Sequence, residues 1–441
     1  MRFLMARFGR YAGLGLAVLW VVCGPQTRAV AFSFKKHKPK TDQSQQKPAE
    51  TASQPPAFSI PVEPLGFFAP GQFYLGQRES LVSLDFLDEN RLLFTFRAPG
   101  LLHRTGPSSD YERQVRAVVL TLPNGATETE SLWTLHGVDR YVWALHNGRF
   151  LLRDGDTLKE GSPALELKPL LQFPGPVLWL QMDPAQQYLV TDSREPQNAK
   201  PDPGKVGSPP TAAASMTSDA DENRGQPEIV VRILRRSSGQ VMLVSHVRTP
   251  VRLPINSDGY LEALRGNGRN WMLNLNLFSG GSRVLGRVDS ACEPPIEFLS
   301  GKTALVNTCL PQAGRSLVAI STEGQHLWSA PSPANQVWPL LIPAPDGSSV
   351  ARETITLDHP VDAFTTLIDA ASMKGQLIEV FDSKNGKRLL KAPADPILDA
   401  GGNIAISPSG KLVAVLNAGA IQVYDLSTPP PTPQAPGTTP H

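Results

Sequence analysis

The chain has 441 residues, 41% of them hydrophobic, and a formal net charge of +2, so it can form a large folded core and is neither strongly basic nor strongly acidic. This balance gives no reason to expect nucleic acid as a partner. The 42 prolines exceed the usual share and gather in a few polar stretches, which indicates a folded domain joined to disordered segments.

Residues 1–31 have the pattern of a signal peptide. The basic segment MRFLMARFGR precedes the apolar stretch YAGLGLAVLWVVCG, and Ala29 and Ala31 provide a small-residue cleavage site. The apolar stretch, like every later one, is shorter than the roughly 20 residues of a transmembrane helix. We therefore expect an exported protein, periplasmic or secreted, whose mature form has no transmembrane helix. The alternatives are an uncleaved N-terminal anchor, or a lipid anchor at Cys23 even though Val22 precedes it.

Three polar, proline-rich stretches are predicted to be disordered because they cannot bury a core: residues 32–57, 194–227 and 429–441. The first is a basic and polar linker, the second interrupts the middle of the chain, and the third is a tail. The folded domain is expected over residues 58–428.

Within this domain one short pattern recurs. Two apolar strands flank a polar turn, as in IAISPSGKLVAVL from Ile404, which predicts a β-hairpin. Seven such hairpins begin at Asp85, Trp143, Leu180, Glu262, Glu297, Leu341 and Ile404. A second hairpin, with glycine at its turn, follows several of them and begins at Val118, Val230, Leu317 and Leu377.

Most repeats therefore contain four strands. Four-stranded antiparallel units at intervals of about 35 to 60 residues are typical of β-propeller blades, so the sequence predicts an all-β, seven-bladed β-propeller. The last repeat ends at Asp425 after three strands, before a proline-rich segment. We expect residues 58–78 to supply the missing strand and close the ring, which would also cover open strand edges.

Several turns and strand ends carry a family resemblance. The turns Ser407–Gly410 and Ala344–Gly347, and the strand ends Val380–Asp382 and Val423–Asp425, resemble exported bacterial WD40-like or YVTN-type seven-bladed β-propeller proteins of unknown function. The Gly-His and Trp-Asp dipeptides of true WD40 blades are missing. The resemblance implies an architecture and names no activity.

Two cysteines, Cys292 and Cys309, remain after the signal peptide. An even pair in an exported protein predicts one disulfide. If Ser300 and Gly301 form the turn of the fifth hairpin, the cysteines are cross-strand partners. Their Cα atoms would then lie about 4.5 to 5.5 Å apart, which a disulfide accepts.

In such a propeller the connections after the second strand of each blade lie on one face. The three longest are predicted there, at residues 97–114, 194–227 and 352–374. Loops on a rigid scaffold commonly carry function, although exposed loops also tolerate insertion. The densest polar set on this face has two interpretations: its arginines pair with carboxylates between blades, which is the favoured one, or they bind an anionic group through bidentate contacts. It comprises Arg97, His103, Arg104, Arg140, Tyr141 and Arg153.

No catalytic, nucleotide-binding or metal-binding motif occurs in the sequence, and we expect neither a metal nor another cofactor. The favoured interpretation is a non-enzymatic, monomeric scaffold for protein interaction or ligand recognition, whose partner is another exported protein or a cell-envelope component. The alternative is a lactonase-like hydrolase with a metal in the central channel. Asp85, Glu262 and Glu297 are the acidic candidates for its inner strands, and whether the protein is an enzyme stays open.

Overall fold

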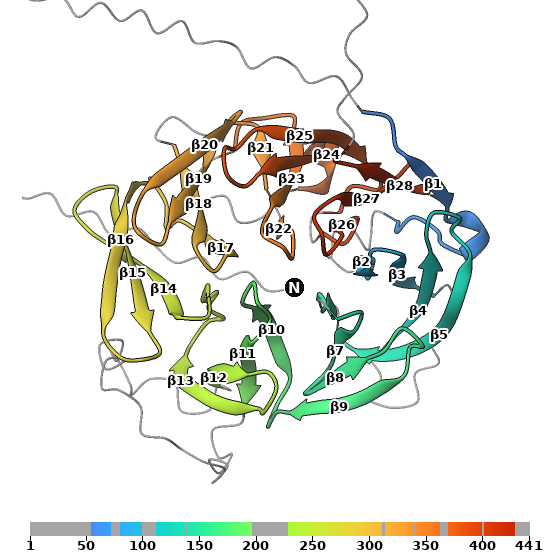
Figure 1. Cartoon of the computed structure of the whole chain (residues 1–441), viewed down its shortest axis with the longest axis horizontal. Helices are drawn as coiled ribbons and strands as arrows, with labels where there is room; N and C mark the ends of the chain where they lie inside the picture. The colour runs from blue at the N-terminus through green and yellow to red at the C-terminus, as the bar shows by residue number, and fades with distance from the viewer. Residues whose placement is uncertain are drawn as a thin grey trace, which may run out of the picture. The chain divides into compact units, whose positions relative to one another are not determined.

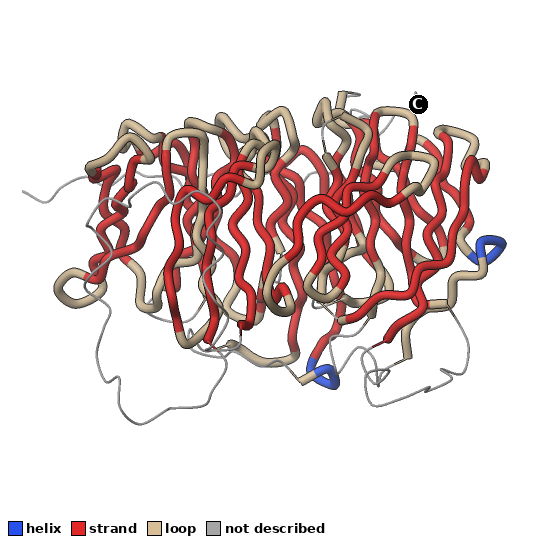
Figure 2. Tube along the Cα trace, turned by 90° about the horizontal axis from the view of Figure 1, so that it is seen from below, coloured by secondary structure: helices blue, strands red, loops and turns tan. Residues whose placement is uncertain are grey.

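The computed structural model describes residues 54–71, 80–98, 112–137, 139–145, 147–195, 228–310, 314–338, 340–361, 369–398 and 401–427. They form seven antiparallel sheets, the blades, arranged in a ring around a central axis (Figure 1); the space around this axis is called the channel, as in other β-propellers. The predicted all-β, seven-bladed propeller is confirmed. Figure 2 shows the strands from the side, running between two layers of turns on opposite faces of the ring.

The blades are numbered in chain order, and within each blade the strands follow one another outward from the channel. Blade 1 contains β2 (Ser83–Asp88), β3 (Arg91–Arg97), β4 (Glu112–Thr121) and β5 (Thr127–His136). Blade 2 contains β6 (Val142–Ala144), β7 (Phe150–Asp154), β8 (Thr157–Gly161) and β9 (Leu167–Gln172). Blade 3 contains β10 (Val177–Met182), β11 (Tyr188–Glu195), β12 (Glu228–Arg235) and β13 (Gln240–Val247). Blade 4 contains β14 (Gly259–Arg265), β15 (Asn270–Leu277) and β16 (Ser282–Asp289).

The remaining blades follow the same outward order. Blade 5 contains β17 (Ile296–Ser300), β18 (Thr303–Cys309), β19 (Arg315–Ser321) and β20 (His326–Ser332). Blade 6 contains β21 (Gln336–Val337) and β22 (Leu341–Pro343), both paired with β23 (Ser349–Leu357), then β24 (Met373–Asp382) and β25 (Arg388–Ala394). Blade 7 contains β26 (Ile404–Ile406), β27 (Leu412–Asn417), β28 (Ala420–Asp425) and the N-terminal β1 (Phe58–Pro61).

The core lies between the blades. Second strands such as β3, RLLFTFR, have apolar residues on both faces because a neighbouring blade covers each face. Phe94 of blade 1 packs with Ala414 and Val423 of blade 7, whereas Leu93 packs with Val142 and other residues of blade 2. Burial of one such large side chain is worth about 1.5 to 3 kcal/mol. Blade-to-blade packing therefore stabilises the ring as a whole.

The two ends of the described chain meet in blade 7, as the sequence predicts. Strand β1 pairs antiparallel with β28, with Phe58 opposite Val423 and Ile60 opposite Ile421. The strand is much shorter than the predicted closing segment of residues 58–78, because the 3₁₀ helix η1 (Glu63–Leu65) follows it directly. Residues 72–79 of that segment lie outside the described residues.

Blade 4 corrects one predicted hairpin. The hairpin from Glu262 was assigned to the two inner strands, but β14 and β15 are the second and third strands. An irregular segment, residues 250–256, takes the inner position: Ile255 bridges Tyr260, and the Leu261 amide donates to the Pro254 carbonyl at 2.8 Å. Pro250 and Pro254 have no backbone N–H, so this segment does not form a regular ladder.

The position of a β-bulge supports the same assignment. In blades 1, 2, 3, 5 and 6 the register shifts between the third and fourth strands. Blade 4 shows this shift between β15 and β16, at Leu273 and Asn274. Bulges are frequent at sheet edges. Strand β16 is therefore the outer strand of a complete blade.

The predicted disulfide between Cys292 and Cys309 is present, with a Cα separation of 5.6 Å. The geometric reason given for it was wrong. The turn lies at Gly301 and Lys302, and Glu297 is opposite Leu305, so the register differs from the predicted one. Cys292 precedes β17, outside any strand, whereas Cys309 ends β18. The bond fixes the entry of blade 5 to the end of its second strand.

The three long connections follow second strands, as predicted, but their bounds differ. Strand β23 continues to Leu357 because TITL keeps the alternating pattern, so the connection in blade 6 begins at residue 358 rather than 352. The 3₁₀ helix η3 (Ala370–Ser372) precedes β24. Residues 99–111, 196–227 and 362–368 of these connections lie outside the described residues.

Candidate functional site

One face of the ring carries the connections from second to third strands and those from each blade to the next. We call it the loop face. The first residues of inner strands and the last residues of second strands lie at this face, because strand direction alternates within a blade. Residues near the starts of the inner strands therefore surround the opening of the channel on the loop face.

Arg252, in the inner segment of blade 4, lies at this opening. Its Cζ is 4.6 Å from the centroid of the Trp179 ring, which β10 of blade 3 supplies. The amide of the preceding residue, Val251, donates to Asp192 Oδ2 at 2.7 Å, and this contact fixes the segment. Within the part of the chain that the structure describes, no hydrogen bond or salt bridge engages the Arg252 guanidinium. Its N–H groups are available to a ligand.

Arg140 has a similar arrangement at the start of blade 2. Its Cζ lies 5.4 Å from the Trp143 ring centroid, and its Nε donates to the Val142 carbonyl at 3.1 Å. The guanidinium is exposed, and its Nη2 lies 3.9 Å from Asp85 Oδ1 of blade 1. A guanidinium stacked on tryptophan keeps its planar N–H edge free for a bidentate contact.

Asp85 is a buried carboxylate on β2. Burial raises its pKa to about 6, against the lowering effects of Arg140 and of hydrogen bonds from Ser83 and the Ala144 amide. The Ser83 hydroxyl donates to Oδ2 at 2.6 Å. The carboxyl group therefore changes charge in mildly acidic solution.

Glu297 provides a second acid, from β17 of blade 5. Its side chain is half-buried. Desolvation by the surrounding protein raises its pKa to about 7, although the positive charges of Arg140 and Arg252 act to lower it. Glu297 of blade 5 therefore lies within electrostatic reach of arginines from two other blades, 2 and 4. We define the channel mouth as six residues contributed by five blades. These are Asp85, Arg140, Trp143, Trp179, Arg252 and Glu297.

The mouth also contains an unused buried donor. The indole Nε1 of Trp179 is inaccessible to solvent and has no hydrogen-bond partner in the described parts of the protein. Buried polar groups of this kind normally pair with protein or ordered water. The Trp179 indole therefore keeps a donor that is unpaired among the described residues and lies below the surface, in the ring that supports the Arg252 guanidinium.

Four of the six residues proposed from sequence lie among the described residues, and their surroundings differ. Arg140 belongs to the channel mouth. Tyr141, its neighbour, is buried, and its hydroxyl donates to the Leu81 carbonyl at 2.9 Å and lies 2.7 Å from Thr95 Oγ1. Burial raises the Tyr141 pKa, so the hydroxyl stays neutral and structural.

Arg153 and Arg97, which belong to the same set, lie on β7 and β3. Arg153 is buried, and its Nη1 donates to the carbonyls of Val177 and Leu178 at 2.7 and 3.2 Å, so it joins blade 2 to blade 3. Burial lowers its pKa. Arg97 ends β3, and its positive charge acts to lower the pKa of Tyr141, against the larger raising effect of burial. His103 and Arg104 lie outside the described residues.

Arg252 was missed in the sequence because the inner segment of blade 4 was not recognised. A signal existed: LPINSDG, from Leu253, resembles LIPAPDG, from Leu341, where the inner strand and turn of blade 6 were identified. Trp179, on the inner strand β10, supports the Arg252 guanidinium.

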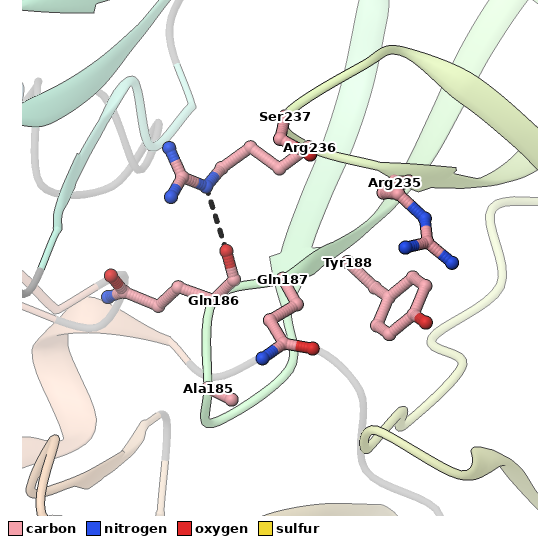
Figure 3. Close-up of a pocket in the computed structure, with 7 residues that line it drawn as sticks. All are labelled: Ala185, Gln186, Gln187, Tyr188, Arg235, Arg236 and Ser237. Atoms are coloured by element: carbon pink, nitrogen blue, oxygen red, sulfur yellow. Dashed lines mark hydrogen bonds between the residues drawn. The ribbon is translucent and has the colours of Figure 1, made fainter.

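A pocket of about 350 Å³ lies on the opposite face, between two turns of blade 3 (Figure 3). Arg235 lies over the Tyr188 ring at 5.6 Å, and Arg236 Nε donates to the Gln186 carbonyl at 2.8 Å. Figure 3 shows the two guanidinium groups pointing to opposite sides of the pocket. They therefore do not converge on one ligand atom.

Among the described residues, no three His, Cys, Asp or Glu side chains gather in a way that could hold a metal ion. Of the acids considered for a channel metal, Asp85 and Glu297 are at the mouth. Glu262 lies on the second strand of blade 4, where it accepts from Asn276 Nδ2 at 2.7 Å. No described helix is long and apolar enough to cross a membrane.

Comparison with solved structures finds other propellers at low identity. The Pyrococcus horikoshii acylaminoacyl peptidase matches with a TM-score of 0.44 and 8% identity, over 76% of this chain and 49% of that chain. The β-propeller domain of the trilobed protease from Pyrococcus furiosus matches with a TM-score of 0.43 and 10% identity, over 81% and 98% of the two chains. An oligogalacturonate lyase in complex with manganese matches with a TM-score of 0.37 and 12% identity, over 78% and 96%.

This chain spans about half the length of the peptidase chain that it matches. No protein-family model and no curated protein sequence matches it. The structural likeness concerns the fold alone.

Proposed function

We propose that this chain is an exported, non-enzymatic β-propeller that recognises another exported protein or a cell-envelope component at its channel mouth. The observation that carries the proposal is the pair of exposed arginines, Arg140 and Arg252, each stacked on a tryptophan of the inner strands. Arginine on an aromatic platform is a common anchor of protein interfaces.

The geometry favours recognition because the anchors are held in place before a partner arrives. Stacking and the Arg140 Nε contact limit the rotamers of these side chains, which reduces the entropy lost on binding. A rigid ring of seven blades holds the two anchors in a fixed relation. A guanidinium group also matches carboxylate and phosphate oxygens in bidentate geometry.

Two features support export. Residues 1–31 have the composition of a signal peptide, and a disulfide joins Cys292 to Cys309, as is common in oxidising compartments. N-terminal sequencing of protein recovered from the cell envelope or medium is expected to begin at Phe32. A mature protein that keeps Met1 would contradict cleavage.

The test is chemical crosslinking of the tagged full chain in its native cells, followed by mass spectrometry. R140A/R252A is expected to lose the partner that the wild type captures. The matched control is R235A, which removes an exposed arginine stacked on Tyr188 at the opposite face. The proposal fails if R140A/R252A captures the partner as efficiently as R235A does.

A further inference from the structure

We propose that the channel mouth binds an anionic oxygen group, a carboxylate or a phosphate, on Arg140 and Arg252, and that its affinity rises as Asp85 and Glu297 become protonated. This inference rests on the proposed function, because it assigns ligand chemistry and regulation to the same mouth. It is argued from the placement of four charged groups that come from blades 1, 2, 4 and 5.

The two arginines are not saturated by protein contacts. The Arg140 Nη2 is 3.9 Å from Asp85 Oδ1, which is longer than a hydrogen bond, and Arg252 has no salt bridge within the described chain. An anionic oxygen group can therefore approach the N–H edges without first breaking a tight ion pair. Trp143 and Trp179 cover one side of each guanidinium, so the ligand contacts are expected at the edges.

The two acids oppose an anionic ligand when they are charged. Glu297 is within electrostatic reach of both arginines, and Asp85 is closest to Arg140. With both acids ionised, the four groups have no net charge, and an incoming anion meets repulsion from two carboxylates. With both acids neutral, the arginines alone set the local potential. Burial raises the pKa of Asp85 to about 6 and that of Glu297 to about 7, so each acid is mostly neutral below its pKa.

The groups that interact with these two acids do not reverse the sign of this effect. Asp85 faces the Ser83 hydroxyl on its own strand, the Ala144 amide and Arg140 of blade 2, and neutral Tyr141. Glu297 faces Arg140 and Arg252.

One further acid titrates in the same range. Burial raises the pKa of Asp192 to about 6, and this carboxylate accepts from the Val251 amide, so its protonation weakens a contact that fixes the segment next to Arg252. Its contribution is separated by the variant D192N, which keeps a side-chain oxygen as acceptor for that amide.

The experiment is calorimetric titration of the purified full chain with sulfate at about pH 5 and about pH 8, at constant ionic strength. Sulfate is chosen because it stays a dianion across this range, so any change belongs to the protein. The wild type is expected to bind about tenfold more tightly at the lower pH, since protonation removes the opposing carboxylate charges. R140A/R252A is expected to lose binding at both pH values.

The acid variants test the cause. D85N/E297Q is expected to bind sulfate equally at both pH values, with the affinity that the wild type has near pH 5. E297Q alone, which alters a half-buried side chain, is expected to lose part of the pH dependence and covers the case in which D85N does not fold. D192N is expected to keep the wild-type dependence.

The inference is overturned if wild-type affinity does not change with pH, or if R140A/R252A still binds sulfate. It is also overturned if D85N/E297Q or E297Q titrates like the wild type. Partner capture without sulfate binding would refute the anion chemistry and leave the proposed function standing. Sulfate binding at the mouth without partner capture there would refute the proposed function alone.

Discussion

At the residue scale, two arginines thirteen positions apart have opposite roles because their surroundings differ. Arg140 is exposed, stacks on Trp143 and keeps donors free for a ligand. Arg153 is buried and donates to the carbonyls of the next blade, and burial lowers its pKa. Replacing Arg140 should change binding, whereas replacing Arg153 should change stability.

Tyr141 provides a stability prediction at this scale. Its hydroxyl donates to the Leu81 carbonyl, so Thr95 Oγ1 donates to Tyr141. Y141F leaves a buried carbonyl without its donor, and we expect a loss of about 1 to 2 kcal/mol in the free energy of unfolding. Urea unfolding measures the change. Y260F is the control, because its half-buried hydroxyl has no hydrogen bond among the described residues. A loss no larger in Y141F than in Y260F would contradict the assigned role.

Glu297 makes stability depend on pH. Its pKa is about 7 in the folded ring, whereas an unfolded glutamate has a pKa of about 4.3. Between these values the native state binds more protons than the unfolded state, so the free energy of unfolding falls as the pH rises through this window. Above about pH 7 the carboxylate is charged in both states, and the loss is complete.

The variant E297Q isolates this effect. It is expected to match the wild type near pH 4 and to be more stable near pH 8, because the neutral amide avoids the cost of a half-buried negative charge. The expected difference is only about 1 kcal/mol, because solvent screens part of that cost. Urea unfolding at the two pH values gives the difference. If the stability difference between E297Q and the wild type does not grow with pH, the pKa of the Glu297 carboxyl is not raised in the folded protein.

At the element scale, local sequence patterns predict the strands and hairpins, but they do not predict which residues of distant blades come together when the ring closes. Six of the seven first hairpins were found because alternating apolar residues and Pro, Gly or Asp turns are local signals. The inner segment of blade 4 was missed because Pro250 and Pro254 interrupt its alternation. The electrostatic interaction of Arg140 with both Asp85 and Glu297 follows only from closure of the ring, which no local pattern contains.

Strand β1 is predicted to be essential for the ring. Ile60 of β1 is buried in blade 7, and burial of one such aliphatic side chain contributes about 1.5 to 3 kcal/mol. A chain lacking residues 1–61 is expected to lose its cooperative thermal transition, whereas one lacking residues 1–53 keeps it. Circular dichroism melting compares the two. Equal melting temperatures would contradict closure by β1.

The disulfide is predicted to stabilise blade 5. It closes a loop between residues 17 positions apart, and the chain-entropy model gives about 3 kcal/mol for a loop of this size. Urea unfolding with and without reductant should show a loss near this value, and the C292S/C309S variant should reproduce it without reductant. Free Cys292 or Cys309 in protein purified without reductant would refute the bond.

At the scale of the whole molecule, the two faces of the ring differ in chemistry. On the loop face, blades 1, 2, 4 and 5 bring two arginines and two carboxylates to the channel mouth. On the opposite face, the blade 3 pocket has guanidinium groups that point apart (Figure 3). A partner of the proposed kind should therefore approach along the channel axis from the loop face.

The most direct measurement places a photoreactive side chain at one of three exposed positions and maps the crosslinks formed with the partner in native cells. The positions are Asp139 beside the channel mouth, Ser237 at the opposite face and Leu132 on the outer strand of blade 1. The account predicts crosslinks from position 139, and none from position 139 once R140A/R252A is added. Crosslinks from position 237 or 132 with none from position 139 would contradict recognition at the channel mouth.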